Sequence, residues 1–130
     1  MIKDLYNLVN GKFSIPPAQK TAAVTGSGVD LKGYEGATIF ALAGDWTDGS
    51  FPFSLQESDD NATYTEVAAA DIVGAQPTIS GADNNVYQFG YVGAKRYIRV
   101  DTGYSQGAGT TGGLFGALIV RGFARREPVH

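Results

Sequence analysis

The sequence of 130 residues predicts an all-β protein, an antiparallel β-sandwich or jelly roll of about eight strands. Segments of alternating apolar and polar residues follow one another every 8–12 residues or so, and turn residues separate them. The chain contains 18 glycines, seven tyrosines and seven phenylalanines, which favours strands joined by tight turns. No Pro/Ser-rich linker divides it, so one domain with a substantial core is expected.

Three parts are expected along the chain: an extended N-terminal arm over residues 1–17, a sandwich over 18–123 and a basic C-terminal tail over 124–130. In the arm, Leu5, Leu8 and Val9 would share one side of one or two helical turns, and the pair Pro16 and Pro17 imposes an extended exit. An arm this apolar would pack either on its own domain or on a neighbour.

The first half of the sandwich begins with a strand over 18–25 and a short strand over 29–31. Residues 37–43 (ATIFALA) have the strongest strand propensity. Trp46 follows in a loop beside two aspartates. It would either cover the core or, as an exposed ring next to acidic groups, form a platform for a sugar.

A hairpin comes next, with strands over 51–56 and 63–67. Phe51, Phe53 and Leu55 alternate with polar residues, and the polar letters SDDN form the turn. The following segment AAADIV fits a helical turn or a strand, and a short extended piece comes after it.

The second half contains strands over 86–91, 96–101 and 114–123. In the first of these Phe89 and Tyr91 share a face with Tyr87, and in the second Ile98 shares a face with Val100. The glycine-rich loop over 103–113 joins the last two strands. It lacks a phosphate-binding motif, because it has no GK[ST] and opens no helix.

The residues that usually carry chemistry are scarce. There is no cysteine, and the single histidine, His130, is the last residue, so disulfides, thiolate metal sites and histidine-based triads are not expected. Asp59 and Asp60, adjacent in a turn, would point apart, and with Asn61 they lack the spacing of a calcium loop. We therefore expect a protein that is not an enzyme and that has no cofactor or metal. No apolar run is long enough to cross a membrane.

Charge is distributed unevenly along the chain, whose net charge is −3. The two ends are basic and the middle is acidic. This pattern fits ordinary solvated surface charge, or two ends that dock on an acidic protein surface. Nucleic acid is not expected as a partner, because the whole chain is acidic and has no basic stripe interleaved with aromatic residues.

The hairpin and the later letters KRYIRV resemble discoidin (F5/8 type C) domains, which are sugar- or lipid-binding β-sandwiches. The matching residues are Leu55, Gln56, Ser58, Asp60, Tyr64, Val67, Arg96, Tyr97, Ile98 and Arg99. Asn61 and Tyr64 stand where that family usually has Gly and Trp. The resemblance implies a carbohydrate-binding module as an alternative function, with a site made by Trp46, Tyr64 and Asp60.

Most of residues 15–122 resembles small virion proteins of tailed bacteriophages. The similar stretches are IPPAQ, VTGSGVDLKGYEGA, GDWTDG, LQESDDN, GYVGAKRYIRV and LIVRG. The resemblance implies a capsid cement or decoration protein, made in the bacterial host cytoplasm. It would sit on the capsid surface as a dimer or trimer and cross-link major capsid protein subunits. A head–tail connector or tail component of the same virion is a further alternative.

The basic ends and the apolar arm indicate which residues such a protein would use for contacts. The predicted capsid or subunit interface consists of Leu5, Tyr6, Phe13 and Ile15 in the arm and Arg121, Arg125 and Arg126 at the tail.

Overall fold

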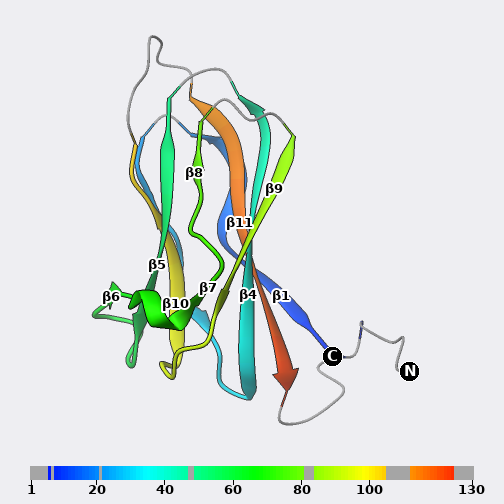
Figure 1. Ribbon diagram of the computed structural model, residues 1–130, viewed down its shortest axis with the longest axis vertical. Coiled ribbons are helices and arrows are strands. Elements are labelled where there is room, and N and C mark those ends of the chain that lie inside the picture. The colour runs from blue at the N-terminus through cyan, green and yellow to red at the C-terminus, as the bar shows by residue number, and fades with distance from the viewer. Residues whose placement is uncertain are drawn as a thin grey trace.

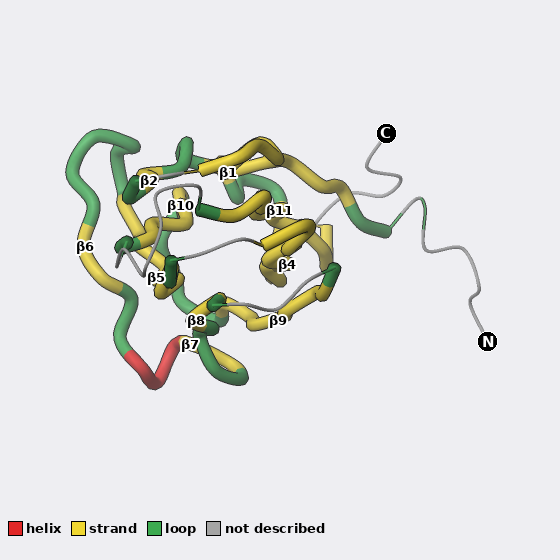
Figure 2. The backbone as a smooth tube through the Cα atoms, turned by 90° about the horizontal axis from the view of Figure 1, so that it is seen from above, coloured by secondary structure: helices red, strands yellow, loops and turns green. Residues whose placement is uncertain are grey.

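The computed structural model describes residues 6, 8–20, 22–46, 49–80, 84–104 and 112–124. They form two antiparallel sheets that pack face to face as a sandwich (Figures 1 and 2). The predicted all-β, antiparallel class is therefore confirmed.

One sheet, here called sheet A, has five strands in the order β1-β11-β4-β9-β7. Every neighbouring pair in it is antiparallel. Its strands are β1 (Asn10–Lys20), β4 (Tyr34–Trp46), β7 (Ile72–Val73), β9 (Asn85–Tyr91) and β11 (Gly113–Ala124).

The opposite sheet, sheet B, has the strand order β2-β10-β5-β6, with β3 added beside β10 and β8 beside β5. Its strands are β2 (Val24–Thr25), β3 (Val29–Asp30), β5 (Phe51–Ser58), β6 (Thr65–Glu66), β8 (Thr78–Ile79) and β10 (Tyr97–Thr102). A single turn of 3₁₀ helix, η1 (Ala69–Asp71), leads from sheet B to sheet A. Among the described residues no helix has the length and apolar character needed to cross a membrane.

The core lies between the sheets and follows the alternation in the sequence. Phe51, Phe53 and Leu55 all point inward from β5, and Ile98 and Val100 point inward from β10. From sheet A, Phe115 meets this layer, with its ring centroid 4.7 Å from that of Phe51 and 5.3 Å from that of Phe53. The alternation predicted for the first strand of the hairpin and the shared face predicted for Ile98 and Val100 are confirmed.

The first strand differs from the expected one. β1 begins at Asn10, so residues 10–17 of the predicted arm belong to sheet A. They pair with β11 from Asn10 opposite Arg121 to Lys20 opposite Gly113. The two prolines lie at an irregularity of this edge strand, between Ile15 and Ala18, where a missing N–H costs no sheet bond.

The segment over 68–73 contains both of the structures that its sequence allowed. Ala69–Asp71 form the 3₁₀ turn and Ile72–Val73 form β7. Six residues are too few for a stable helix, and the pairing of Ile72 with Tyr91 draws the end of the segment into sheet A.

Candidate interaction surface

The outer face of sheet A is built from the alternate residues of β4, β9 and β11. Ile39 pairs with Ile119 and both are fully buried, so the neighbouring pair, Phe40 and Leu118, must face outward. The apolar outward residues of this sheet, including the edge strand β1, are Phe13, Phe40, Leu42, Val86, Leu114, Leu118 and Val120. We call this surface the sheet A face.

The sheet A face is exposed to solvent although it is apolar. Val86 is 58% exposed, Phe13 46% and Leu114 37%. No described strand lies beyond sheet A on the side away from sheet B (Figure 2). Between residues 36 and 44, 86 and 90, and 114 and 122, none of the outward positions carries a charge. Contiguous apolar surface of this kind marks an interaction site more often than open surface.

One end of the sheet A face is hollow. Gly36, Gly90 and Gly122 lie on neighbouring strands at this end, and they line a groove of about 580 Å³. Leu8 and Val9 line it as well, and so do Val73 and Val92, which are both more than half exposed. Glycines inside strands often mark places where another chain approaches closely.

The outer face of sheet B has the opposite character. The Arg99 guanidinium stacks on the Tyr64 ring at 4.0 Å and donates a hydrogen bond to Gln56 Oε1 at 2.7 Å. The Gln56 amide donates in turn to Glu66 at 3.2 Å. On the same face, the Thr25 hydroxyl donates to an Asp101 carboxylate oxygen at 2.9 Å. These polar groups are paired with one another and suit a solvated face.

Two carboxylates, Asp30 at the end of β3 and Asp60 in the loop after β5, are held in the ionised form. Arg96 donates two hydrogen bonds to Asp30, at 2.9 and 2.8 Å, and lowers the pKa of that carboxyl to about 2. The backbone N–H groups of Thr63 and Ala62 and the Ser58 hydroxyl all donate to Asp60 and lower its pKa to about 2. In each case hydrogen bonds to the charged form favour ionisation. The bonds of Asp60 close a local turn, whereas Asp30 is paired with a residue 66 positions away.

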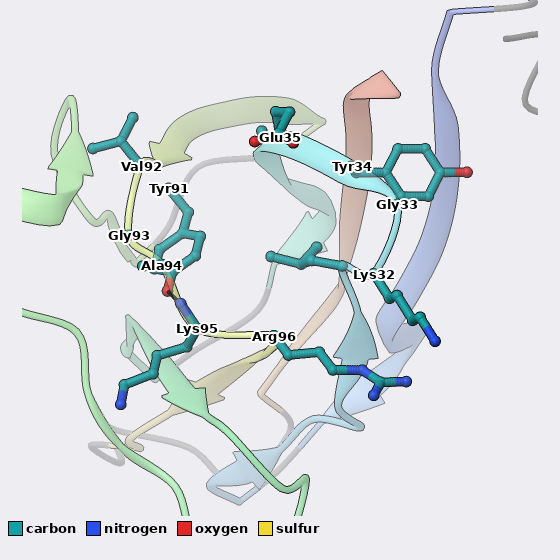
Figure 3. A pocket seen from close by; sticks show the side chains of 12 residues that line it. Lys32, Gly33, Tyr34, Glu35, Tyr91, Val92, Gly93, Ala94, Lys95 and Arg96 are labelled. Carbon is teal, nitrogen blue, oxygen red and sulfur yellow. Dashed lines mark hydrogen bonds between the residues drawn. The ribbon is translucent and has the colours of Figure 1, made fainter. Parts of the chain in front are cut away.

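A second cavity, of about 620 Å³, lies at one end of the sandwich and is lined by Lys32, Lys95 and Arg96. Lys95 and Arg96 extend in different directions (Figure 3), and they form ion pairs with Asp59 and Asp30, each at 2.8 Å. The Tyr91 hydroxyl donates to Glu57 at 2.8 Å and accepts from the Lys95 N–H at 3.0 Å. Lys95, Arg96 and Tyr91 are therefore already engaged by groups of the protein and are not free to hold an anion.

The predicted interface residues are distributed unevenly between surface and interior. Tyr6 is 68% exposed, and Phe13 lies on the sheet A face. Ile15, at 1% exposure, is part of the core, so its side chain is not available to a partner. Leu5, Arg125 and Arg126 lie outside the described residues.

Arg121 is also buried, at 9% exposure, because it continues the inward series of Ile119. Its guanidinium donates to the Asp30 carbonyl at 2.9 Å and to the Asn10 side chain, and it stacks on Tyr34 at 4.6 Å. Its Nε is buried without a hydrogen-bond partner among the described residues. Arg121 therefore joins β11, β1 and the start of β4, and its charge does not reach the surface.

The residues proposed for a sugar site do not come together. Trp46 packs on the core at the start of β5, with its ring 5.5 Å from that of Phe51, as expected for a residue that covers the core. Asp60 and Tyr64 follow Ser58 at the other end of β5. The length of β5 places Trp46 roughly 23 Å from Asp60 and Tyr64. One face of the Tyr64 ring is already covered by Arg99.

Most of the sheet A face was missed by sequence reasoning, although the sequence contained a signal. The runs TIFALA and LFGALIV are apolar without alternation. Continuous apolar strands are typical of sheets covered on both faces, whereas strands with one wet face alternate. That signal would have added Phe40, Leu42 and Leu118 to the predicted interface.

Comparison with known proteins supports the fold. No family model matches the chain, and no curated protein sequence does. The crystal structure of the SPBc2 prophage-derived protein YomS is similar, with a TM-score of 0.51 and 17% identity, covering 87% of this chain and 92% of that one. At this identity the likeness shows a shared sandwich fold alone.

Two further structures match with TM-scores below 0.5. The structure of infectious bursal disease virus, Gx strain, matches with a TM-score of 0.49 and 11% identity over 92% of this chain, which spans 33% of the viral one. The CBM32 of AlyQ in complex with 4,5-unsaturated mannuronic acid matches with a TM-score of 0.42 and 20% identity, covering 92% and 98% of the two chains.

Proposed function

We propose that this protein is a structural component of a tailed-phage virion that binds the outside of the capsid and cross-links neighbouring major capsid protein subunits. The observation that carries the proposal is the contrast between the two outer faces of the sandwich. Sheet B presents polar groups paired with one another, whereas the described outward positions of β4, β9 and β11 in sheet A are mainly apolar and uncharged. Interfaces between subunits are depleted of charge at their centres in the same way.

The sequence resemblance to phage virion proteins supports the same role, and the fold shared with a prophage-derived protein agrees with it. In this proposal the two ends of the chain dock on the capsid. Tyr6 lies exposed just ahead of β1, and Arg125 and Arg126 follow the end of β11. Many copies on one shell would multiply modest contacts by avidity.

The test is co-sedimentation of the purified protein with capsids that lack it. One variant deletes residues 1–8, which leaves β1 intact because that strand begins at Asn10. Another carries Arg125→Glu and Arg126→Glu. Both are expected to lose most capsid binding, since each removes one docking end.

A matched control carries Lys32→Glu and Lys95→Glu, which reverse two exposed charges at the end cavity. It is expected to bind like the parent protein. Undiminished binding by both test variants would contradict the proposal. Copy number separates a decoration protein from a connector, because a shell carries on the order of hundreds of copies and a connector ring on the order of ten. Saturable binding on a glycan array would favour the carbohydrate-binding alternative.

A further inference from the structure

We infer that the sheet A face is covered by the same face of a second copy of this chain, in a two-fold symmetric dimer. This inference goes beyond capsid binding: it assigns the apolar face that supports the proposed function to a second copy, while the two ends of the chain dock on the capsid. It rests on the shape of the face, on its lack of charge and on its size.

The shape of the face is complementary to itself. A cross-strand row runs through Phe13, Leu118, Phe40 and Gln88, on β1, β11, β4 and β9. To one side of this row, Leu42, Val86 and Leu114 protrude. To the other side lie Gly36, Gly90 and Gly122, which line the groove. The face therefore has knobs at one end and a hollow at the other.

A two-fold axis in the plane of the interface, perpendicular to the strands and passing through that row, superimposes knobs on hollows. Leu114 lies four residues before Leu118 and Gly122 four residues after it. The rotation therefore places Leu114 of each copy over Gly122 of the other, where it would contact the Leu8 and Val9 that lie against that glycine. Val86 and Gly90 lie two residues before and two residues after Gln88. Val86 of each copy therefore faces Gly90 of the other. Strands would then run nearly aligned between the two sheets, which is a common packing of sheet on sheet.

The lack of charge removes the usual obstacle to such a pairing. In an isologous interface every group on the face meets an equivalent region of its copy, so like charges would often oppose each other. The outward positions described for β4, β9 and β11 carry none, and among the described residues that line the groove the one charged side chain, Glu35, lies at its end next to Gly36. The polar groups near the row, Gln88 and Thr38, already bond to each other at 3.1 Å. Formation of the dimer would therefore bury few polar groups that lack a hydrogen-bond partner.

The size of the face suits a dimer. Four strands about 4.8 Å apart, with stretches about nine residues long, give a face of roughly 19 by 30 Å. Its flat area is then roughly 600 Å², and side chains increase the accessible area further. A stable complex buries about 800 Å² per partner. A second copy brings a surface of the same extent and the same apolar character.

The experiment measures self-association by sedimentation equilibrium without capsids. The parent protein is expected to be a dimer at micromolar concentration. The double variant Val86→Glu, Leu114→Glu adds charges at two exposed positions that the dimer would bury. It is expected to raise the dimer dissociation constant by roughly 100-fold or more. The control Thr65→Glu places a charge on exposed β6 of sheet B and is expected to dimerise like the parent protein.

A second measurement tests the position of the axis in the parent background. The chain has no cysteine, so each single-cysteine variant has one thiol. Gln88→Cys places thiols of the two copies beside the axis, and a short bismaleimide is expected to join them, whereas Thr65→Cys stays uncrosslinked. Facing sheets lie about 10 Å apart, which is too far for a direct disulfide.

A parent protein that stays monomeric, or equal cross-linking of the Gln88→Cys and Thr65→Cys variants, would overturn the inference. If the parent protein is a monomer and the double variant Val86→Glu, Leu114→Glu no longer binds capsids, the sheet A face is assigned to the capsid instead of a second copy. If the variants that alter the two ends of the chain bind capsids as well as the parent protein does, and the parent protein is a dimer, the result counts against the proposed function alone.

Discussion

At the scale of single residues, Asp60 shows how the hairpin turn between β5 and β6 is fixed. Its carboxylate accepts from the N–H groups of Ala62 and Thr63 at 2.9 and 3.0 Å. The Ser58 hydroxyl donates to it and accepts from the N–H groups of Asp60 and Asn61. Asn61 has a φ of 60°, a conformation that asparagine tolerates better than most residues. The SDDN letters thus encode a turn.

The Asp60 turn leads to a pH prediction. The pKa of Asp60 falls from 3.8 to about 2 on folding, so its contribution to stability is complete above pH 4 and is lost as pH falls through about 2. Asp60→Asn keeps an acceptor oxygen but cannot ionise. Urea unfolding of this variant between pH 5 and pH 2 is expected to show a smaller loss of stability than the parent protein shows. Thr65→Asn, an exposed uncharged control, should retain the parent slope, and an unchanged slope in Asp60→Asn would contradict the assignment.

At the scale of elements, Ser14 connects the two sheets. It is 1% exposed in β1, its hydroxyl donates to the Ser27 carbonyl at 2.9 Å, and it accepts from the Val100 N–H at 2.9 Å. The Ser27 N–H donates to the Ser14 carbonyl at 2.8 Å. The edge strand of sheet A is therefore bonded to β10 of sheet B and to the link between β2 and β3.

Ser14→Ala is expected to lower the free energy of unfolding by about 1–3 kcal/mol, because the buried Val100 N–H loses its acceptor. Urea denaturation at neutral pH measures this. Ser54→Ala is the matched control, since its hydroxyl donates to the Asp101 carbonyl at 3.3 Å on the outer face of sheet B, where water can replace it. A loss below about 0.5 kcal/mol is expected there. Equal losses in the two variants would show that the Ser14 bonds do not connect the sheets energetically.

Also at this scale, the strands of sheet A differ from those of sheet B in their sequence pattern. β5 alternates strictly between buried and more exposed residues from Phe51 to Gln56, which made its inward residues predictable. β11 reads as a continuous apolar run, and its outward Leu114 is exposed in a single chain. The second copy that we infer on the sheet A face accounts for the apolar residues at the outward positions of β11, where β5 has mostly polar ones.

At the scale of the whole molecule, dimerisation should link stability to concentration. If the folded state is a dimer and unfolding releases monomers, mass action raises the Tm as concentration increases. Over a hundredfold range of concentration the Tm of the parent protein is expected to rise by about 4–8 °C. Differential scanning calorimetry measures this rise. The double variant Val86→Glu, Leu114→Glu should show no rise, and a concentration-independent Tm in the parent protein would contradict the dimer.

Alternation and turn chemistry are local properties, so the local structure of this protein could be predicted from neighbouring residues. The inward positions of Phe51, Ile98 and Phe89 and the turn at Asp60 follow from neighbouring letters. Features that depend on partners far along the chain became visible in the folded structure. Arg121 is buried because Asp30, which is 91 residues away, and Asn10 accept its hydrogen bonds. The sheet A face exists because β11 pairs with β4 in a register that aligns Leu118 with Phe40, and no local pattern specifies that register.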